Sequence, residues 1–290
     1  MKIKEIYAQK KEQKQPVISL EIFPPKKEDG IASLYQTIEE LGAIKPDFIS
    51  VTYGAGGSEN GVNKTLELAS EIKHKYGVES LHHLTCVLNN KEQISTILSE
   101  IKENGVENIL ALRGDVPIGV SELPNAYHYA KDLIQDVQEI GGFSVGAACY
   151  PEGHIDQLNS RENITHLREK EEAGADFFIS QLFFENSSFY RLLDDARSAR
   201  VNAPIAAGIM PIMSRVQVEK MIFLCGASLP TKLIKLIHKY EHNIEDLRKA
   251  GLEYALAQVD DLIAHGVDGV HLYTMNRPVV AKTTLMRYRK

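Results

Sequence analysis

The sequence is poor in cysteine and in long apolar runs, and it has no tryptophan. Its three cysteines, Cys86, Cys149 and Cys225, lie far apart, with no Cys-x-x-Cys pair and no cysteine–histidine spacing. This pattern argues against a disulfide framework and a structural zinc site, and it favours buried thiols. No segment approaches the roughly 18 apolar residues of a membrane-spanning helix, and the polar N-terminus has no signal-peptide core. We therefore expect a cytoplasmic protein with no membrane partner.

An excess of positive charge is also missing. Lys and Arg number 33 against 39 Asp and Glu, which gives a formal net charge of −6. No net basic field favours nucleic acid, so we expect small-molecule partners. At roughly 150 residues per domain, the 290 residues allow one large domain or two ordinary ones.

Short apolar runs recur along the whole chain. They occupy residues 17–23, 47–53, 80–87, 107–114, 143–150, 177–184, 204–212 and 269–275. Several are apolar on both faces, as are the strands of a covered parallel sheet. Segments of helical period lie between them, at 31–42, 61–76, 91–104, 125–140, 160–173, 187–200 and 214–225.

Residues near the ends of these runs follow one another at intervals of 31, 31, 32, 35, 31, 29 and finally 65 residues. They are Glu21, Thr52, His83, Asp115, Tyr150, Gln181, Met210 and Met275. The long interval has room for extra helices around 229–240 and 243–265. Eight strand–helix units predict a single α/β domain, a (β/α)8 barrel over 16–290, after a polar N-terminal arm or helix over 1–15. A doubly wound open sheet is the alternative. It lacks a GxGxxG turn, because the nearest candidate has Glu59 in place of the third glycine.

In such a barrel the C-terminal ends of the strands form the active face, so polar residues there are the candidates. Glu21 is a lone carboxylate in the apolar run LEIF. Burial there disfavours the charged form and suits a general acid, whereas an ion pair with a nearby Arg or Lys is the structural alternative. The glycines after Thr52 and Tyr53 admit a flat or anionic ligand, although a plain glycine turn explains them equally well.

Later strands end in further candidates. Arg113 could hold a phosphate and Asp115 could accept from a heterocyclic N–H, although such a pair is often structural. Gln181 suits an amide-like ring edge such as a pterin, or bonds to neighbouring backbone. Arg277 could bind a carboxylate, or lie on the surface. No strand contains lysine, which counts against a Schiff-base aldolase, and no motif predicts a metal site.

Eight motifs follow one another between positions 19 and 277: SLEIFPPK, FISVTYGAGGS, HHLTC, ILALRGDVP, ACYPEGH, FFISQLFF, GIMPI and LYTMNR. Together they resemble the flavin-dependent methylenetetrahydrofolate reductase family, in its bacterial form that has only the catalytic domain. The resemblance implies a (β/α)8 barrel that binds FAD non-covalently. It also implies ping-pong reduction of 5,10-methylenetetrahydrofolate to 5-methyltetrahydrofolate by NADH or NADPH. That reaction belongs to one-carbon metabolism and methionine biosynthesis.

The resemblance also implies roles for single residues. Glu21 matches the family's general acid, and Asp115 matches an acidic residue near the flavin that also binds the pterin. Thr52 matches a contact to the nicotinamide donor, Gln181 a pterin contact and Arg277 a contact to the benzoyl-glutamate end. The implied FAD-binding positions are Tyr53, Ala55, His83, Arg113, Gly114, Asp115, Tyr129, Ala130, Tyr150, His154, Asn163 and Lys170.

The chain departs from the family pattern in three places. Asn163 stands where the family often has Asp, Glu169 where it often has a basic residue, and residues 213–216 replace an aromatic-bearing segment. The resemblance implies no C-terminal regulatory domain, and hence no inhibition by S-adenosylmethionine. It leaves open FMN in place of FAD, a homo-oligomer, and a flavin-bearing subunit of a larger electron-transfer complex in which a partner supplies the electrons.

Overall fold

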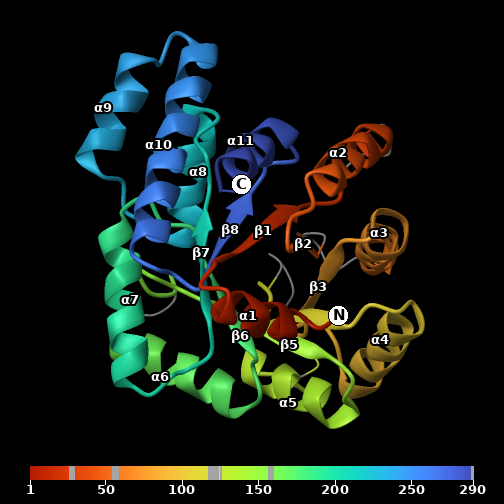
Figure 1. The fold of residues 1–290 in the computed structure, drawn as a ribbon. Helices are drawn as coiled ribbons and strands as arrows, with labels where there is room; N and C mark the ends of the chain where they lie inside the picture. Colours follow the sequence, from red (N-terminus) through yellow and green to blue (C-terminus); the bar gives the residue numbers. More distant parts are fainter. Residues whose placement is uncertain (26–29, 54–58, 117–123, 125, 156–159, 289–290) are drawn as a thin grey trace.

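The computed structural model describes residues 1–25, 30–53, 59–116, 124, 126–155 and 160–288. Eight parallel strands close into a barrel in the order of the chain (Figure 1). They are β1 (Val17–Ile22), β2 (Phe48–Val51), β3 (Glu79–Thr85), β4 (Asn108–Leu112), β5 (Ser144–Cys149), β6 (Phe177–Ser180), β7 (Ile205–Ile209) and β8 (Gly269–Tyr273). The predicted (β/α)8 barrel is confirmed, and the open sheet is wrong.

Helices follow the strands and surround the barrel. They are α2 (Ile31–Ala43), α3 (Glu59–Tyr76), α4 (Lys91–Glu103), α5 (Ala130–Ile140), α6 (Ser160–Glu172), α7 (Asn186–Ser198), α8 (Arg215–Cys225) and α11 (Pro278–Tyr288). Two more, α9 (Thr231–Lys239) and α10 (Ile244–Ala264), occupy the long interval before β8, where the sequence predicts extra helices.

A first helix, α1 (Ile3–Glu12), lies across the N-terminal end of the barrel (Figure 1). Its Ile3, Ile6 and Tyr7 are buried against interior side chains of the strands, among them Phe48 and Phe177. The predicted polar lead-in is therefore amphipathic, because its apolar face closes the bottom of the barrel. The opposite end, where the strands terminate in polar residues, is therefore the end at which a binding site is expected.

Some helix and strand boundaries differ from the sequence prediction. Helix α5 begins at Ala130 and not at 125, because Asp132 Oδ2 accepts hydrogen bonds from the backbone N–H groups of His128 and Tyr129, each at 2.9 Å. This arrangement caps the helix and fixes its start. The strands also end before their apolar runs do, as at Ser180 and Tyr273, so the polar residues that follow lie on loops at the active face.

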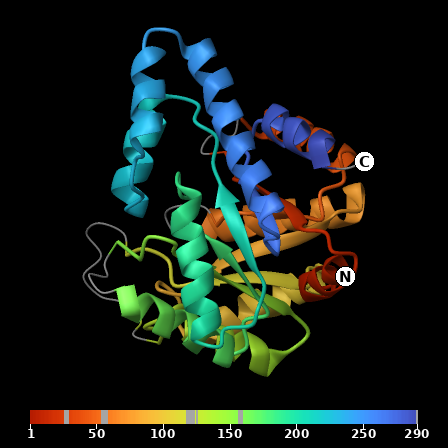
Figure 2. The ribbon, with the colours of Figure 1, turned by 60° about the vertical axis from the view of Figure 1, so that its left-hand side comes forward.

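Helices α8, α9 and α10 extend beyond the barrel on one side (Figures 1 and 2). Leu233 of α9 and Leu247 of α10 pack with Met210 and Ile212, which follow β7, in an apolar cluster separate from the barrel core. Helix α10 approaches this loop so closely that a Cβ on Gly251 would lie 2.2 Å from the carbonyl oxygen of Ile212. The helical layer thus forms one wall above the strand ends.

Candidate active site

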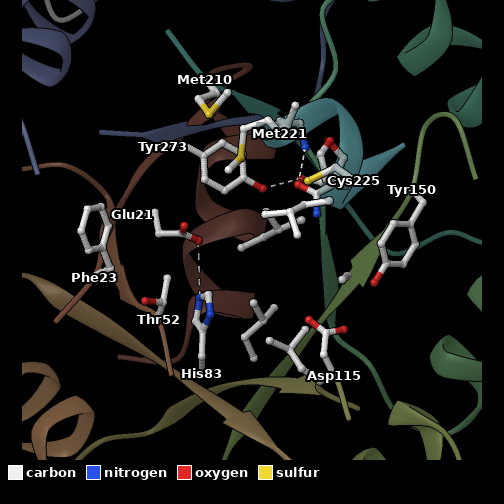
Figure 3. Close-up of a pocket in the computed structure, with 18 of the residues that line it drawn as sticks. Glu21, Phe23, Thr52, His83, Asp115, Tyr150, Met210, Met221, Cys225 and Tyr273 are labelled. Atoms are coloured by element: carbon white, nitrogen blue, oxygen red, sulfur yellow. Dashed lines mark hydrogen bonds and ion pairs between the residues drawn. The ribbon is translucent and has the colours of Figure 1, made fainter. Parts of the chain in front are cut away.

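The C-terminal ends of the strands enclose a cavity of about 540 Å³, here called the central cavity. Strand-end residues from all around the barrel line it, including Glu21, Thr52, His83, Asp115, Gln181 and Tyr273. Figure 3 shows several of these side chains pointing into the same space. Residues that lie up to about 250 positions apart in the chain therefore share one site, as a (β/α)8 barrel requires.

Glu21 lies at the base of the central cavity with 16% of its side chain exposed. Its Oε2 lies 3.5 Å from His271 Nε2. The same oxygen lies 3.8 Å from His83 Nε2 (Figure 3). In the described part of the chain no Lys or Arg pairs with this carboxylate, so the structural alternative of an ion pair finds no partner there. Burial lowers the pKa of His83 to about 4, against the opposing effect of Glu21, and this imidazole is neutral at physiological pH.

The loop after β4 places Asp115 at the exposed rim of the cavity. Gly114 before it has φ of 84°, and a Cβ there would lie 3.0 Å from Thr85 Cβ, so this turn requires glycine. Arg113 donates from Nε to the Gly114 carbonyl oxygen at 3.2 Å and also lines the cavity. A carboxylate and a guanidinium group therefore lie at the same rim of the cavity.

Gln181 follows β6 and lines the same cavity. Its Oε1 accepts a hydrogen bond from the backbone N–H of Leu182 at 2.9 Å, which fixes the amide and leaves its NH2 group as a donor for a ligand. Tyr273 is partly buried and donates to the Ser180 carbonyl oxygen at 2.9 Å (Figure 3). Met210, Met221 and Cys225 complete an apolar wall beside it (Figure 3).

A second cavity of about 330 Å³, here called the side cavity, adjoins the first between the ends of β4 and β5 and helices α5 and α6. The two share Leu112, Arg113, Ala148, Tyr150 and His154. Tyr150 stands edge-on to His154, with ring centroids 4.8 Å apart. One extended ligand could occupy both spaces.

Lys170 of α6 is a partly buried cation that lines the side cavity. Burial lowers its pKa to about 8, and Nζ donates to the Ala148 carbonyl oxygen at 3.0 Å. Among the described residues no carboxylate lies within ion-pair distance of it. Asn163, one of the departures from the family pattern, donates to the Tyr150 carbonyl oxygen at 2.8 Å and so ties α6 to the end of β5.

The outer part of the side cavity is a cluster of aromatic and charged side chains. The rings of Tyr129 and His166 stack, with centroids 5.4 Å apart and planes 27° from parallel. Glu169 Oε2 lies 3.1 Å from both His166 Nδ1 and Lys131 Nζ, and these two hydrogen-bonding partners lower the pKa of Glu169. The acidic departure at 169 is thus neutralised by a lysine from α5.

The structure brings most, but not all, of the predicted site residues together. The central cavity holds Glu21, Thr52, His83, Arg113, Gly114, Asp115, Tyr150, His154 and Gln181, and the side cavity adds Tyr129, Ala130, Asn163 and Lys170. Tyr53 is partly buried against the core and Arg277 is exposed just before α11, and neither lines the central or the side cavity. Ala55 lies outside the described residues.

Sequence reasoning missed several residues of the site. His271 and Tyr273 lie inside the apolar run of β8, and only the alternation of that strand could have placed them inward with Thr274 beyond. Lys131 and His166 lie on helices and resemble solvent-facing charge, whereas Glu169 was noted only as a departure from the family pattern. Cys225 is only partly buried and lines the central cavity, while Cys86 and Cys149 are buried as predicted; all three are free thiols.

The described residues show neither a metal site nor a membrane-spanning helix. They contain no group of three or more His, Cys, Asp or Glu side chains placed to hold a metal ion. None of the helices in the described ranges is long and apolar enough to cross a membrane.

Comparison with known proteins agrees with this architecture. The family model of methylenetetrahydrofolate reductase matches residues 6–288. The chain is 33% identical over 260 residues to 5,10-methylenetetrahydrofolate reductase of Escherichia coli, covering 90% of this chain and 86% of that one. It is 34% identical over 279 residues to methylenetetrahydrofolate reductase (NADH) 1 of Arabidopsis thaliana. That alignment covers 91% of this chain but only about half, 47%, of the plant protein.

A solved structure supports the fold alone. It is an uncharacterized protein from Clostridium thermocellum, described as binding two copies of 5-methyl-5,6,7,8-tetrahydrofolic acid. The TM-score is 0.67 at 15% identity, over 97% of this chain and 96% of that one. The family-wide match and the bacterial relative carry more weight, and by both the chain belongs to the methylenetetrahydrofolate reductase family.

Proposed function

We propose that the protein reduces 5,10-methylenetetrahydrofolate to 5-methyltetrahydrofolate with NADH or NADPH, through a non-covalently bound FAD. The observation that carries this proposal is Glu21 at the base of a cavity that continues into a second, cation-bearing cavity. A carboxylic acid without a Lys or Arg partner in the described structure suits proton donation to a bound substrate. The continuation suits a ligand with a flat ring at one end and a phosphate-bearing arm at the other.

The residues of the side cavity fit the diphosphate and adenosine of FAD. The Lys170 ammonium is partly buried, and among the described residues its one hydrogen-bond acceptor is the Ala148 carbonyl, so a phosphate would supply an anion for this cation. The stacked pair of Tyr129 and His166 offers a platform for an adenine ring. FMN would leave that platform unused, which favours FAD. Bound flavin would supply the hydride carrier between nucleotide and folate.

In the central cavity, the chain's own residues would bind the substrate and move the proton. Glu21 would protonate the leaving nitrogen as the five-membered ring of the folate opens. Gln181 would donate its free NH2 to the pterin, and Asp115 would accept from a pterin N–H at the rim. Thr52 would contact the nicotinamide. Because donor and folate would use the same cavity, they would bind in turn, which gives ping-pong kinetics.

Separate half-reactions test the proposal. The purified protein should be yellow, NADH or NADPH should bleach the flavin without oxygen, and methylenetetrahydrofolate should then restore the colour and yield 5-methyltetrahydrofolate. A protein that binds no flavin, or a reduced flavin that folate does not reoxidise, would contradict the proposal.

One result would favour the electron-transfer subunit instead. In that result neither NADH nor NADPH bleaches the oxidised flavin, yet folate reoxidises the flavin after chemical reduction. Such a protein would need another protein as its electron source. A non-catalytic folate-binding barrel would give neither half-reaction.

A further inference from the structure

A polar cluster lies in the barrel interior one layer below Glu21. Ser19 of β1, Ser50 of β2 and His271 of β8 are all fully buried. The β1–β8 register pairs Ser19 with His271 and, in the layer above, Glu21 with Tyr273. Polar groups at this depth cost free energy unless they are paired, and barrel interiors are ordinarily filled by bulky apolar side chains. The packing of the core does not explain why they are here.

The cluster is connected to the carboxylate of Glu21. His271 Nδ1 lies 2.8 Å from Ser19 Oγ, while Nε2 lies 3.4 Å from Ser50 Oγ and 3.5 Å from Glu21 Oε2. His83 approaches the same oxygen at 3.8 Å. Since Oε2 is the nearer oxygen for both imidazoles, Oε1 is the oxygen left for a ligand in the cavity.

The hydrogen bond to Ser19 selects the tautomer of His271. The Ser19 hydroxyl has two acceptors in reach, His271 Nδ1 at 2.8 Å and the Val270 carbonyl oxygen at 3.5 Å. The shorter contact favours donation to Nδ1, which then carries no hydrogen, so the ring hydrogen sits on Nε2. That N–H faces Glu21 and Ser50. A donor facing a carboxylate stabilises its ionised form.

We propose that His271 is a positioning residue for Glu21, holding Oε2 so that the proton to be donated sits on Oε1, toward the substrate. After donation, the same N–H stabilises the carboxylate that remains. This inference rests on the proposed role of Glu21 as the acid. Contacts of this kind are often long before the substrate binds and shorten in the complex, which is consistent with 3.5 Å here.

The other titratable groups around Glu21 leave this effect readable. From β3, His83 is neutral because burial lowers its pKa to about 4. From β8, burial raises the pKa of Tyr273 well above its usual value, with Glu21 adding to the effect, so its phenol is neutral too. Across the cavity, the loop after β4 contributes Asp115 and Arg113. If substitution of His271 shifts the alkaline limb of the pH–rate profile for folate reduction, that shift would therefore report on Glu21.

The test compares His271→Phe with His271→Gln, whose amide N–H can replace Nε2–H. His82→Phe is the matched control, because His82 of β3 is an equally buried histidine that does not line the cavity. Each half-reaction is followed against pH by rapid mixing. For His271→Phe we expect flavin reduction by NAD(P)H to be unchanged and folate reduction to slow by roughly ten- to a hundredfold. Its alkaline limb should move to higher pH, and His271→Gln should restore part of both changes.

Infrared difference titration gives a readout that does not need turnover. The protonated-carboxyl band that Glu21→Gln removes should persist to higher pH in His271→Phe than in the unmodified protein. An unmoved alkaline limb and an unmoved band would overturn the proposal, as would equal effects from His82→Phe. If His271→Phe fails to fold, His271→Gln and Ser19→Ala decide by the same two measurements. Failure of the unmodified enzyme to reduce folate would instead refute the proposed function.

Discussion

The two cavities meet at Tyr150, yet the chain builds them in opposite ways. The central cavity is formed by strand ends, whose positions the closed barrel fixes through paired backbone. The side cavity is formed largely by side chains of α5 and α6, held by ion pairs such as Lys131–Glu169 that are about one-third exposed. Geometry in the first is rigid and in the second is adjustable. We therefore expect chemistry to depend on the central cavity and cofactor affinity on the side cavity.

Substitution of Glu21 by Gln should separate the two cavities most clearly. Gln keeps the shape of the side chain but cannot donate a carboxyl proton, so the folate half-reaction should slow by roughly 10²- to 10⁴-fold. Flavin content and reduction by NAD(P)H should stay the same, because Glu21 does not line the side cavity. Rapid-mixing measurement of both half-reactions checks this, and equal losses in the two would break the comparison.

Lys170→Ala should have the next largest effect, and on the other side of the comparison. It removes the partly buried Lys170 cation from the side cavity, and charge-assisted hydrogen bonds of about 1.5–3 kcal/mol correspond to roughly ten- to a hundredfold weaker FAD binding. Fluorescence titration of flavin-free protein measures this, with Lys170→Arg as the charge-preserving control. Once saturated with FAD, the Ala variant should reduce folate at nearly the original rate. A lost rate with unchanged affinity would reverse the assignment.

The difference between the strand-built central cavity and the helix-built side cavity also explains which site residues could be predicted from the sequence. The barrel and most of the central cavity were predictable because strands of a parallel sheet share one polar edge, so spacing alone assembles Glu21, Asp115 and Gln181. His271 was hidden because a histidine inside an apolar strand looks like core. The charged cluster of the side cavity was hidden because charges at helical spacing are indistinguishable from a solvated face. Tyr53 and Arg277 follow strand ends in the sequence and match the family pattern, yet neither lines the central or the side cavity.

Raising the pH should weaken flavin binding but not flavin reduction. Burial lowers the pKa of Lys170 to about 8 in the flavin-free protein, so the cation needed for phosphate is lost as pH rises through that value. Affinity should be constant below about pH 7 and decline above about 8, until the pH reaches the higher pKa that Lys170 has beside a phosphate. Titrations of FAD across this range measure the slope. Lys170→Arg should remove it, and a slope that survives the substitution would assign the dependence to another group.

Glu169→Gln should have the smallest effect, because its partners are partly exposed and solvent screens them. It removes a negative charge from the cavity proposed for the diphosphate and releases Lys131 to approach a phosphate. We therefore expect FAD to bind tighter, but by less than about fivefold, the range of exposed ion pairs. Glu172→Gln is a matched control, since Glu172 pairs with Arg168 on the same helix and does not line the cavity. Weaker binding would instead mean that Glu169 holds Lys131 and His166 in the geometry the cofactor needs. The side cavity would then be as preorganised as the central one.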